Sequence, residues 1–373
     1  MIRGNIMPRE PGGRFYSLDA LRGLAALSIV LWHWQHFFPP ESFRAERQPL
    51  YPLLILFYTN GLRAVDLFFC LSGFIFFWLY AEKISSARIS GREFFILRFS
   101  RLYPLHAATL IFVAAAQFIR WQATGSFFIY PENDAYHFLL HSALASSIGL
   151  ERGYSFNGPA WSISVEAFLY LLFFFSCRVA MPRWPFCLLA ILAGIALWTV
   201  YLPIGRGLIS FFVGGGMYLA YRRITERRLP LAIPCVALAA LGWGVTLAQA
   251  WFGPFEHSPA IPTLWSIFLL FPLTVLALAL AETQRGTLGR RLSFLGDISY
   301  SSYLIQFPLQ LVFVGAAALI GLRSEHFYSP VMMALFFLVL IALSMASSRY
   351  FERPAQQWLR QIGAPSLART TSS

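Results

Sequence analysis

Charged side chains are scarce in this chain. Asp, Glu, Lys and Arg together make up 12% of its 373 residues, whereas soluble globular domains carry about 25%. Hydrophobic residues make up 57% of the chain, and its mean hydropathy is +0.59. This composition excludes a water-soluble globular protein and predicts a membrane protein that crosses the bilayer several times.

Cysteines are also few. The chain has four, and they lie in or beside apolar stretches at spacings that do not match a zinc site. We interpret them as small packing residues, so the sequence predicts neither a disulfide framework nor a bound metal. These cysteines are Cys70, Cys177, Cys187 and Cys235.

The chain contains many long apolar stretches. About ten are long enough to cross a bilayer as helices, and none alternates polar and apolar residues as a barrel strand does. We therefore predict an all-α fold, a polytopic transmembrane helical bundle of about ten spans. Two further segments are not expected to cross the membrane: 82–102 is predicted to be a cytoplasmic amphipathic helix, and the short apolar segment 138–150 is predicted to be re-entrant or interfacial. The expected spans are 17–37, 62–81, 103–120, 159–178, 184–202, 205–221, 230–252, 261–281, 298–322 and 329–348.

Basic residues predict the orientation of these spans. Most of the 29 Lys and Arg residues fall on one side of the predicted membrane, and cytoplasmic loops are enriched in such residues. Both termini are therefore expected to be cytoplasmic, with 1–363 forming one membrane domain and 364–373 a flexible cytoplasmic tail. The net charge of +12 is explained by this topology and by anionic lipid head groups, so no nucleic-acid partner is predicted.

Two residues of the first apolar run, Arg22 and His33, indicate a functional site. On an α-helix, side chains with this spacing lie roughly 16 Å apart along the axis. Placing a cation and an imidazole inside a bilayer costs free energy, so a functional site is the default interpretation of such residues. The alternatives are a basic anchor that reaches the interface, for Arg22, and a core histidine bonded to a backbone carbonyl, for His33.

Two acids lie at the outer ends of later spans. Asp66 is expected at about the depth of His33, and Glu166 enters the membrane from outside. A carboxylate that faces an imidazole raises the basicity of the free ring nitrogen, as a general base for a hydroxyl requires. The alternative for Asp66 is a structural acid that joins two helices. Trp161 and Ser162, one turn from Glu166, supply the aromatic plane and the hydroxyl that suit a carbohydrate site.

A basic pair marks the cytoplasmic side. Arg98 and Arg101 are three residues apart on one helical face just before a span, and arginine pairs of this kind bind phosphate groups. With Arg22 at the same expected depth, they suit a polyanionic donor such as coenzyme A. The alternative is contact with lipid head groups, which accounts for one of these arginines more easily than for three.

Six motifs, in this order, resemble the acyltransferase 3 family over residues 16–354. The resemblance implies a membrane-bound O-acyltransferase of the bacterial inner membrane. Such an enzyme transfers an acyl group, usually acetyl, from cytoplasmic acyl-coenzyme A to a hydroxyl of an extracytoplasmic or lipid-linked carbohydrate, such as exopolysaccharide or lipopolysaccharide. The motifs are Arg22 with its spaced His33, Val65-Asp66-Leu67-Phe68-Phe69 with Ser72-Gly73-Phe74, Arg98 with Arg101-Leu102-Tyr103-Pro104, Trp161-Ser162-Ile163 with Glu166, Ser299-Tyr300, and Glu352-Arg353-Pro354.

The resemblance also assigns roles by position. Arg22 and His33 match the family's functional pair, and Glu166 matches the acid of its tryptophan–serine motif. One departure is Gln306, where family members often have histidine. Glutamine can hydrogen-bond but cannot titrate, so the acid–base role falls to His33. The expected donor-binding residues are Arg22, Arg98, Arg101, Tyr103, Ser299 and Tyr300, and the expected acceptor-binding residues are Asn157, Trp161, Ser162 and Gln306.

We therefore hypothesise that arginines hold the phosphates of acyl-coenzyme A, a donor substrate and not a resident cofactor, while His33 deprotonates the acceptor hydroxyl. Asp66 and Glu166 are expected to orient the ring or to stabilise its charged form. The rival function is a transporter or flippase of a glycan or its precursor. A third hypothesis is a catalytically silent relative that holds a glycan-synthesis complex together. Expected partners are membrane lipid, the carbohydrate acceptor and, because many relatives carry a fused periplasmic domain, a periplasmic partner protein.

Overall fold

Helices make up the regular structure of this protein. The computed structural model describes residues 13–179, 183–253 and 260–363, and these ranges contain no strand, which confirms the predicted all-α fold. Within these ranges, eight helical segments are long and apolar enough to cross a membrane, as expected for a multi-pass membrane protein. They are Tyr51–Ser85, Gly91–Thr124, Gly158–Val179, Leu202–Glu226, Ala232–Phe252, Ile261–Arg285, Ser299–Leu319 and Pro330–Gly363.

The two remaining predicted spans correspond to shorter helices. α1 (Tyr16–Trp32) and α8 (Trp184–Val200) have 17 residues each. α8 is apolar throughout, whereas α1 carries Asp19 and Arg22. The count of about ten spans and the side on which the termini lie stay predictions, and the predicted tail at 364–373 lies outside the described residues.

The chain divides into two compact units, and each is described by itself. Unit 1 comprises Met1–Ile29, Ile55–Arg88 and Leu171–Asp297. Unit 2 comprises Val30–Leu54, Ile89–Tyr170 and Ile298–Ser373. Three of the five boundaries fall inside α1, α2 (Tyr51–Asn60) and α7 (Trp161–Val179), so these helices contribute residues to both units.

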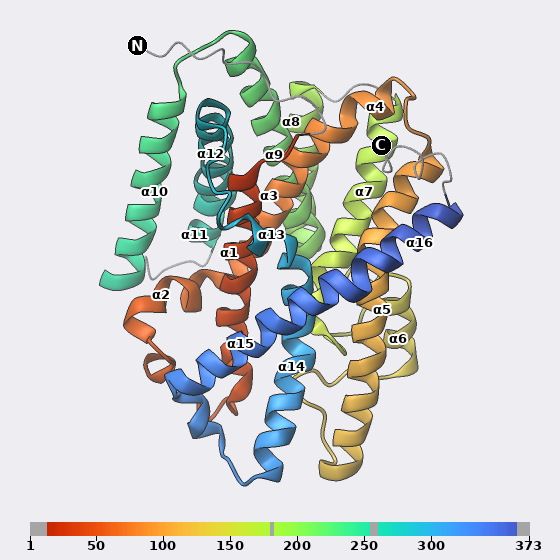
Figure 1. The fold of residues 1–373 in the computed structure, drawn as a ribbon, viewed down its shortest axis with the longest axis vertical. Coiled ribbons are helices and arrows are strands. Elements are labelled where there is room, and N and C mark those ends of the chain that lie inside the picture. Colours follow the sequence, from red (N-terminus) through yellow and green to blue (C-terminus); the bar gives the residue numbers. More distant parts are fainter. Residues whose placement is uncertain (1–12, 180–182, 254–259, 364–373) are drawn as a thin grey trace. The chain divides into compact units, whose positions relative to one another are not determined.

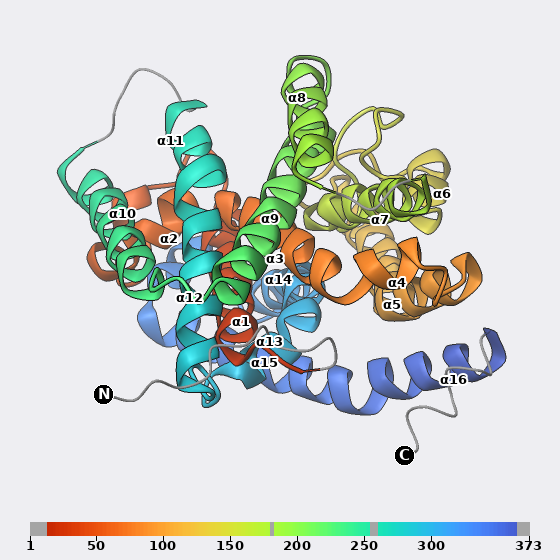
Figure 2. The same ribbon diagram turned by 90° about the horizontal axis from the view of Figure 1, so that it is seen from above.

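Unit 1 is built around α9 (Leu202–Glu226), whose residues 205–216 are all buried. α9 packs against α3 (Ala64–Phe76), α8 and α12 (Phe271–Arg285), and α10 (Ala232–Phe252) packs against α12 (Figures 1 and 2). The other elements of the unit are its parts of α1, α2 and α7, the 3₁₀ turn Gly61–Arg63, the π turn Phe77–Ala81, α4 (Glu82–Ser85), α11 (Ala260–Trp265), the π turn Ser266–Leu270 and α13 (Ser293–Asp297).

Glycines bring α3 and α9 into backbone contact. A Cβ on Gly73 of α3 would lie 1.8 Å from the carbonyl oxygen of Phe211, and a Cβ on Gly214 of α9 would lie 1.9 Å from that of Cys70. Both oxygens belong to the helix backbone, so neither can move unless its whole helix moves. Small residues allow such close approach in membrane helices, where dispersion contacts rather than water release hold helices together.

We expect Gly73→Ala to lower the free energy of unfolding by about 1–3 kcal/mol, because the new methyl group forces the two helices apart. Gly244→Ala on α10 is the matched control, since a Cβ there meets nothing within 4 Å. It should be neutral or stabilising, because alanine favours helix over glycine. Thermal unfolding of both variants in detergent tests this, and equal melting temperatures would contradict the close packing.

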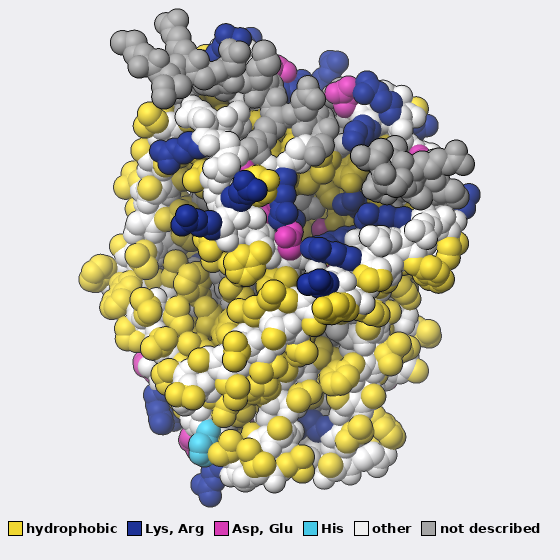
Figure 3. Space-filling view, viewed as in Figure 1, with side chains coloured by type: hydrophobic (Ala, Val, Ile, Leu, Met, Phe, Trp, Pro, Cys, Tyr) yellow, Lys and Arg dark blue, Asp and Glu magenta, His cyan; other side chains and the backbone are white. Residues whose placement is uncertain are grey.

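Unit 2 is built on α5 (Gly91–Thr124) and α14 (Ser299–Leu319), which pack against each other (Figure 1). α15 (Pro330–Ala346) packs on α14, and α16 (Arg353–Gly363) packs on α5. The surface over α15 is largely hydrophobic (Figure 3), as a lipid-facing helix requires. The other elements are the 3₁₀ turns His33–Phe37, Ala45–Arg47, Gly158–Ala160 and Ser324–Tyr328, α6 (Ala135–Ser142), the first part of α7, and the π turn Ser347–Glu352.

The two predicted non-spanning segments differ in outcome. The bounds expected for the amphipathic helix, 82–102, are wrong: α4 ends at Ser85, and α5 begins at Gly91 and continues unbroken to Thr124. A capping box between Ser90 and Glu93 starts this helix, and Pro104 lies inside it without ending it. The segment over 138–150 contains only the end of the eight-residue α6, which is too short to cross a bilayer.

Candidate functional site

His33 lies in unit 2 at the first residue of the 3₁₀ turn that follows α1, and it is 6% exposed. One side chain of α14 holds this turn. The Nε2 of Gln310 donates to the backbone carbonyl of His33 at 2.9 Å, and its Oε1 lies 3.1 Å from Nδ1 of His36. The two imidazole rings lie 4.8 Å apart between their centroids. The predicted histidine is therefore buried and held from its backbone.

Aromatic residues surround His36. Its ring contacts Tyr130 and Phe307 edge to face, at centroid distances of 5.7 and 6.1 Å. Burial raises the pKa of Tyr130, so its hydroxyl stays neutral. We refer to His33, His36, Tyr130, Phe307 and Gln310 as the His33 cluster.

The predicted acceptor residues pack onto the same helix. The Tyr303 hydroxyl lies 2.8 Å from Oγ of Ser162 and donates to the Pro159 carbonyl. The Asn157 amide donates to the Leu304 carbonyl at 3.0 Å. Trp161, Ser162 and Asn157 are buried, and Gln306 is buried on α14. The structure thus brings the start of α7 against the middle of α14.

Three of the six predicted donor residues belong to a second group in unit 2. The Arg98 guanidinium lies 6.0 Å from the ring centroid of Tyr170, and the Arg101 guanidinium lies 5.4 Å from that of Tyr300. The Tyr300 hydroxyl donates to the Leu102 carbonyl.

The predicted donor residues Ser299 and Tyr103 are also held by packing. Ser299 is buried, and Tyr103 stacks on Phe99. We refer to Arg98, Arg101, Tyr170 and Tyr300 as the arginine–tyrosine group.

Glu166 belongs with the arginine–tyrosine group by its contacts. Its carboxylate accepts a hydrogen bond from Tyr170, the residue whose ring lies under Arg98. The expectation that Glu166 acts beside His33 stays a prediction.

Glu352 is a buried acid that the sequence reasoning did not choose as a site residue. Its Oε1 accepts from Ser301 at 2.5 Å and from Ser347 at 2.9 Å. The π turn Ser347–Glu352 directs it inward, and it is 2% exposed. The Glu352-Arg353-Pro354 motif marked this residue in the sequence. The π turn that places its carboxylate in the interior was not predictable from the motif.

Arg22 lies in unit 1 with its guanidinium held from two sides. Its Nη2 lies 2.9 Å from Oδ1 of Asp19 and donates to the Gly296 carbonyl at 2.9 Å. Arg14 binds the other Asp19 oxygen at 2.5 Å and reaches Asp297 at 2.7 Å. Arg22 is therefore oriented by a network of opposite charges while its side chain stays 34% exposed. Its predicted role in binding the donor remains a prediction.

Asp66 forms an ion pair that the sequence did not reveal. It is fully buried in the first turn of α3, and Arg206 of α9 binds its two oxygens at 3.1 and 2.6 Å. This is the structural alternative, an acid that joins two helices. His33 belongs to unit 2, so a pairing with Asp66 stays a prediction. Arg206 itself was missed, although an arginine next to the apolar stretch 207–216 was a visible signal.

Two other features lie apart from these groups. Glu132, Asp134 and His137 lie close enough to hold a metal ion, but both ring nitrogens of His137 already have protein partners, Oδ1 of Asp134 at 2.7 Å and the amide of Arg152 at 3.2 Å. The backbone N–H of His137, and next its ring, hold the pKa of Asp134 below its usual value. We therefore interpret these three residues as stabilising the fold of their own loop and not as a metal site.

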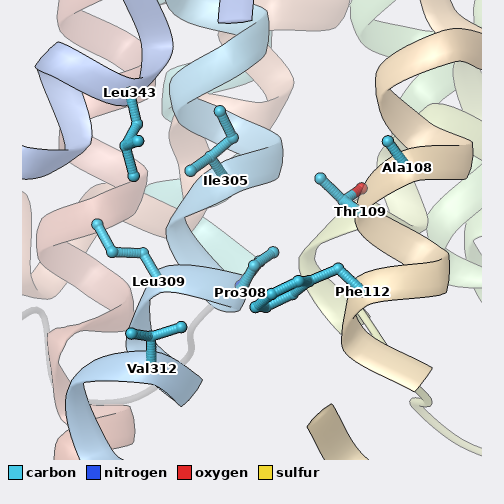
Figure 4. A pocket seen from close by; sticks show the side chains of 8 residues that line it. All are labelled: Ala108, Thr109, Phe112, Ile305, Pro308, Leu309, Val312 and Leu343. Carbon is cyan, nitrogen blue, oxygen red and sulfur yellow. The ribbon is translucent and has the colours of Figure 1, made fainter. Parts of the chain in front are cut away.

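A pocket of about 240 Å³ lies between α5, α14 and α15 (Figure 4). Its only hydroxyl, on Thr109, donates back to the Leu105 carbonyl at 3.0 Å. The pocket offers contacts to hydrocarbon and no group that acts in acyl transfer. It is lined by Ala108, Thr109, Phe112, Ile305, Pro308, Leu309, Val312 and Leu343.

A variant of Gln310 tests whether the His33 turn depends on this side chain. Gln310→Leu leaves the His33 carbonyl and one His36 nitrogen without their partner, so we expect the free energy of unfolding to fall by about 1–3 kcal/mol. Thermal unfolding in detergent measures this. Gln310→Glu is the comparison, because its carboxylate keeps the acceptor for His36 but loses the donor for His33. Unchanged stability in Gln310→Leu would show that the turn is held by other contacts.

Two known proteins match this chain, one over a short stretch and the other over most of its length. A protein of Rhizobium radiobacter named Protein 2 in picA locus is 39% identical over 109 residues, which cover 29% of this chain and 49% of that protein. The matched stretch thus spans about half of that relative. Acyltransferase MdmB of Streptomyces mycarofaciens is 27% identical over 325 residues, which cover 79% of this chain and 78% of that protein. No solved structure matches the chain.

The family comparison agrees with the motifs and the helical fold. The model of the family described as acyltransferase domain matches residues 15–353, which include both the His33 cluster and the arginine–tyrosine group. This confirms the predicted family and, with the apolar helices, supports acyl transfer by a membrane enzyme. The chain therefore belongs to the acyltransferase domain family.

Proposed function

We propose that this membrane acyltransferase transfers an acyl group, in the simplest case acetyl, from cytoplasmic acyl-coenzyme A to a hydroxyl of an extracytoplasmic or lipid-linked carbohydrate. His33 acts as the general base. The observation that carries the proposal is the His33 turn: a buried histidine whose backbone is fixed by Gln310. A buried imidazole on a backbone turn that is held in place is suited to removing a proton from a hydroxyl.

The arginine–tyrosine group supports a polyanionic donor. Arg98 and Arg101 lie one turn apart on α5, each against a tyrosine ring. Contact with an aromatic face orients a guanidinium through its π system, while phosphate binding uses the N–H donors at its edge. Two arginines so oriented suit the phosphates of coenzyme A. Tyr300 fixes α14 against this part of α5 through the Leu102 carbonyl.

The acceptor side of the proposal rests on the start of α7. Ser162 and Asn157 are held against α14, and Trp161 lies beside them in the chain. Aromatic, hydroxyl and amide groups of this kind recognise sugars by stacking and hydrogen bonding. We propose a bacterial inner-membrane location and, where the acceptor lies beyond the membrane, a periplasmic partner protein that presents it.

The glycan of a deletion strain tests the proposal. Mass spectrometry of cell-surface glycans should show ester-linked acyl groups in the parent strain, their loss on deletion and their return with the wild-type gene. His33→Ala, expressed to the wild-type level in membranes, should fail to restore them. The transporter hypothesis predicts a change in the amount of exported glycan with its acylation intact. That outcome would contradict the proposal.

A further inference from the structure

Gln306 is a buried amide in the middle of α14. Its side chain is 0% exposed, and neither Oε1 nor Nε2 has a hydrogen-bond partner among the described residues. Burying an unpaired amide costs stability, and most buried polar groups in native proteins are paired. A residue that keeps such an amide in the core is therefore a candidate for binding a group that arrives with a ligand.

The neighbours of Gln306 on α14 place it beside the His33 cluster. Tyr303, three residues before, and Gln310, four residues after, share its face of the helix. The Tyr303 hydroxyl lies 2.8 Å from Oγ of Ser162, and Gln310 donates to the His33 carbonyl at 2.9 Å. Gln306 thus lies between the contact to the start of α7 and the contact to the His33 turn.

A second buried polar atom without a hydrogen-bond partner among the described residues is the side-chain oxygen of Asn157, a residue that contacts the same stretch of α14. Asn157 is 1% exposed, and its Nδ2 donates to the Leu304 carbonyl at 3.0 Å. Its Oδ1 has no hydrogen-bond partner in the part of the chain that the structure describes. Leu304 is two residues before Gln306 in the sequence of α14, so a second buried amide with an unpaired atom contacts the same stretch of this helix.

We propose that Gln306 is a catalytic residue, whose Nε2 donates a hydrogen bond to the acyl carbonyl oxygen as that oxygen becomes negatively charged. The inference rests on the proposed function. The acceptor oxygen forms a bond to the acyl carbon while His33 takes the hydroxyl proton. The carbonyl oxygen then carries the negative charge. When the carbon–sulfur bond breaks, the carbonyl forms again, and the thiolate of coenzyme A receives the proton from His33.

A glutamine suits this task better than a titratable residue. Fixed donors aimed at a developing oxyanion in a site that excludes water stabilise the transition state, and removing one such donor slows turnover by about 10²- to 10³-fold. An amide N–H remains a donor at every pH near neutrality, and it does not compete with His33 for the transferred proton. Charge develops on the carbonyl oxygen only during reaction, so the effect falls on kcat and not on substrate binding.

The test compares activity and stability in the same variants. Gln306→Leu removes the amide with little change in volume, Gln306→His restores an N–H donor, and Ser344→Ala is the matched control. Ser344 of α15 also has a buried hydroxyl without a partner among the described residues. Initial rates are measured against acetyl-coenzyme A concentration, with a cell-envelope glycan fraction as the acceptor probe, and melting temperatures are measured in the same detergent.

We expect Gln306→Leu to lower kcat by about 10²-fold with little change in KM for acetyl-coenzyme A, and to melt at the wild-type temperature or above. Gln306→His should recover part of the rate, and Ser344→Ala should keep it. Full activity in Gln306→Leu, or a rate that falls only in step with its melting temperature, overturns the inference while the proposed function stands. If the wild-type protein transfers no acyl group, both fall.

Discussion

His33→Ala is expected to reduce acyl transfer by about 10²- to 10⁴-fold, because it removes the base that accepts the hydroxyl proton. His33→Gln should be equally inactive, since an amide keeps hydrogen bonding but cannot take up a proton. The Gln310 contact goes to the His33 backbone, which both variants retain. The fold of the turn should therefore survive, and the loss should appear in kcat.

The control for this prediction is another buried histidine of unit 2. His106 is 2% exposed on α5, and its Nε2 lies 2.8 Å from the His141 carbonyl. His106→Gln can keep a donor for that carbonyl, so we expect its rate to stay within a few-fold of wild type. Initial rates and membrane expression of all three variants give the comparison. An active His33→Gln would remove the imidazole from the chemistry.

Breaking the Asp66–Arg206 pair is expected to cost about 3–5 kcal/mol of unfolding free energy, because the remaining charge stays buried without its partner. Asp66 is 0% and Arg206 8% exposed, so water cannot replace the lost contact. Asp66→Asn and Arg206→Met should each lower the melting temperature strongly. The double replacement Asp66→Leu with Arg206→Met should recover much of the loss, because it leaves no buried charge.

An exposed ion pair provides the comparison. Arg88 and Glu82 lie 3.1 Å apart with side chains 66% and 63% exposed. Glu82→Gln should change stability by about 0–1 kcal/mol. If Asp66→Asn instead folds with wild-type stability and loses only activity, Asp66 acts in catalysis and the structural interpretation is wrong.

The sequence predicted the helices well because each depends on its own apolar run. The last span begins at Pro330, one residue from the predicted start, and the helix at 205–221 lies inside α9. The error at 82–102 has a local cause. Residues 82–102 are expected to form one amphipathic helix, whereas the capping box at Ser90 starts a new helix that continues to Thr124.

Partners far apart in the sequence were not predictable from periodicity. The Gln310 side chain holds the backbone of His33 across the unit. The sequence around either residue contains no signal that the two lie in contact. The same holds for Asp66 and Arg206, and for the Gly296 carbonyl that binds Arg22. Residue chemistry identified which side chains are expensive in a membrane. Which of them meet depends on helix packing, and only the structure supplies that.

The glycines beside Arg22 illustrate this difference. A Cβ on Gly23 of α1 would lie 2.3 Å from Cβ of Leu295, and one on Gly296 would lie 2.4 Å from the Asp19 carbonyl oxygen. Both glycines therefore allow α13 to approach α1, which brings the Gly296 carbonyl to Arg22. Both glycines are visible in the sequence, but the contacts that require them depend on how α1 and α13 pack.

The most direct test of this account follows the acyl group itself. Purified protein is incubated with acetyl-coenzyme A labelled in its acetyl group and with a cell-envelope glycan fraction, and base-labile label on the glycan is counted. The account predicts ester-linked label with the wild-type protein and background label with His33→Ala. Equal labelling by the two proteins, or none by the wild type, would contradict it.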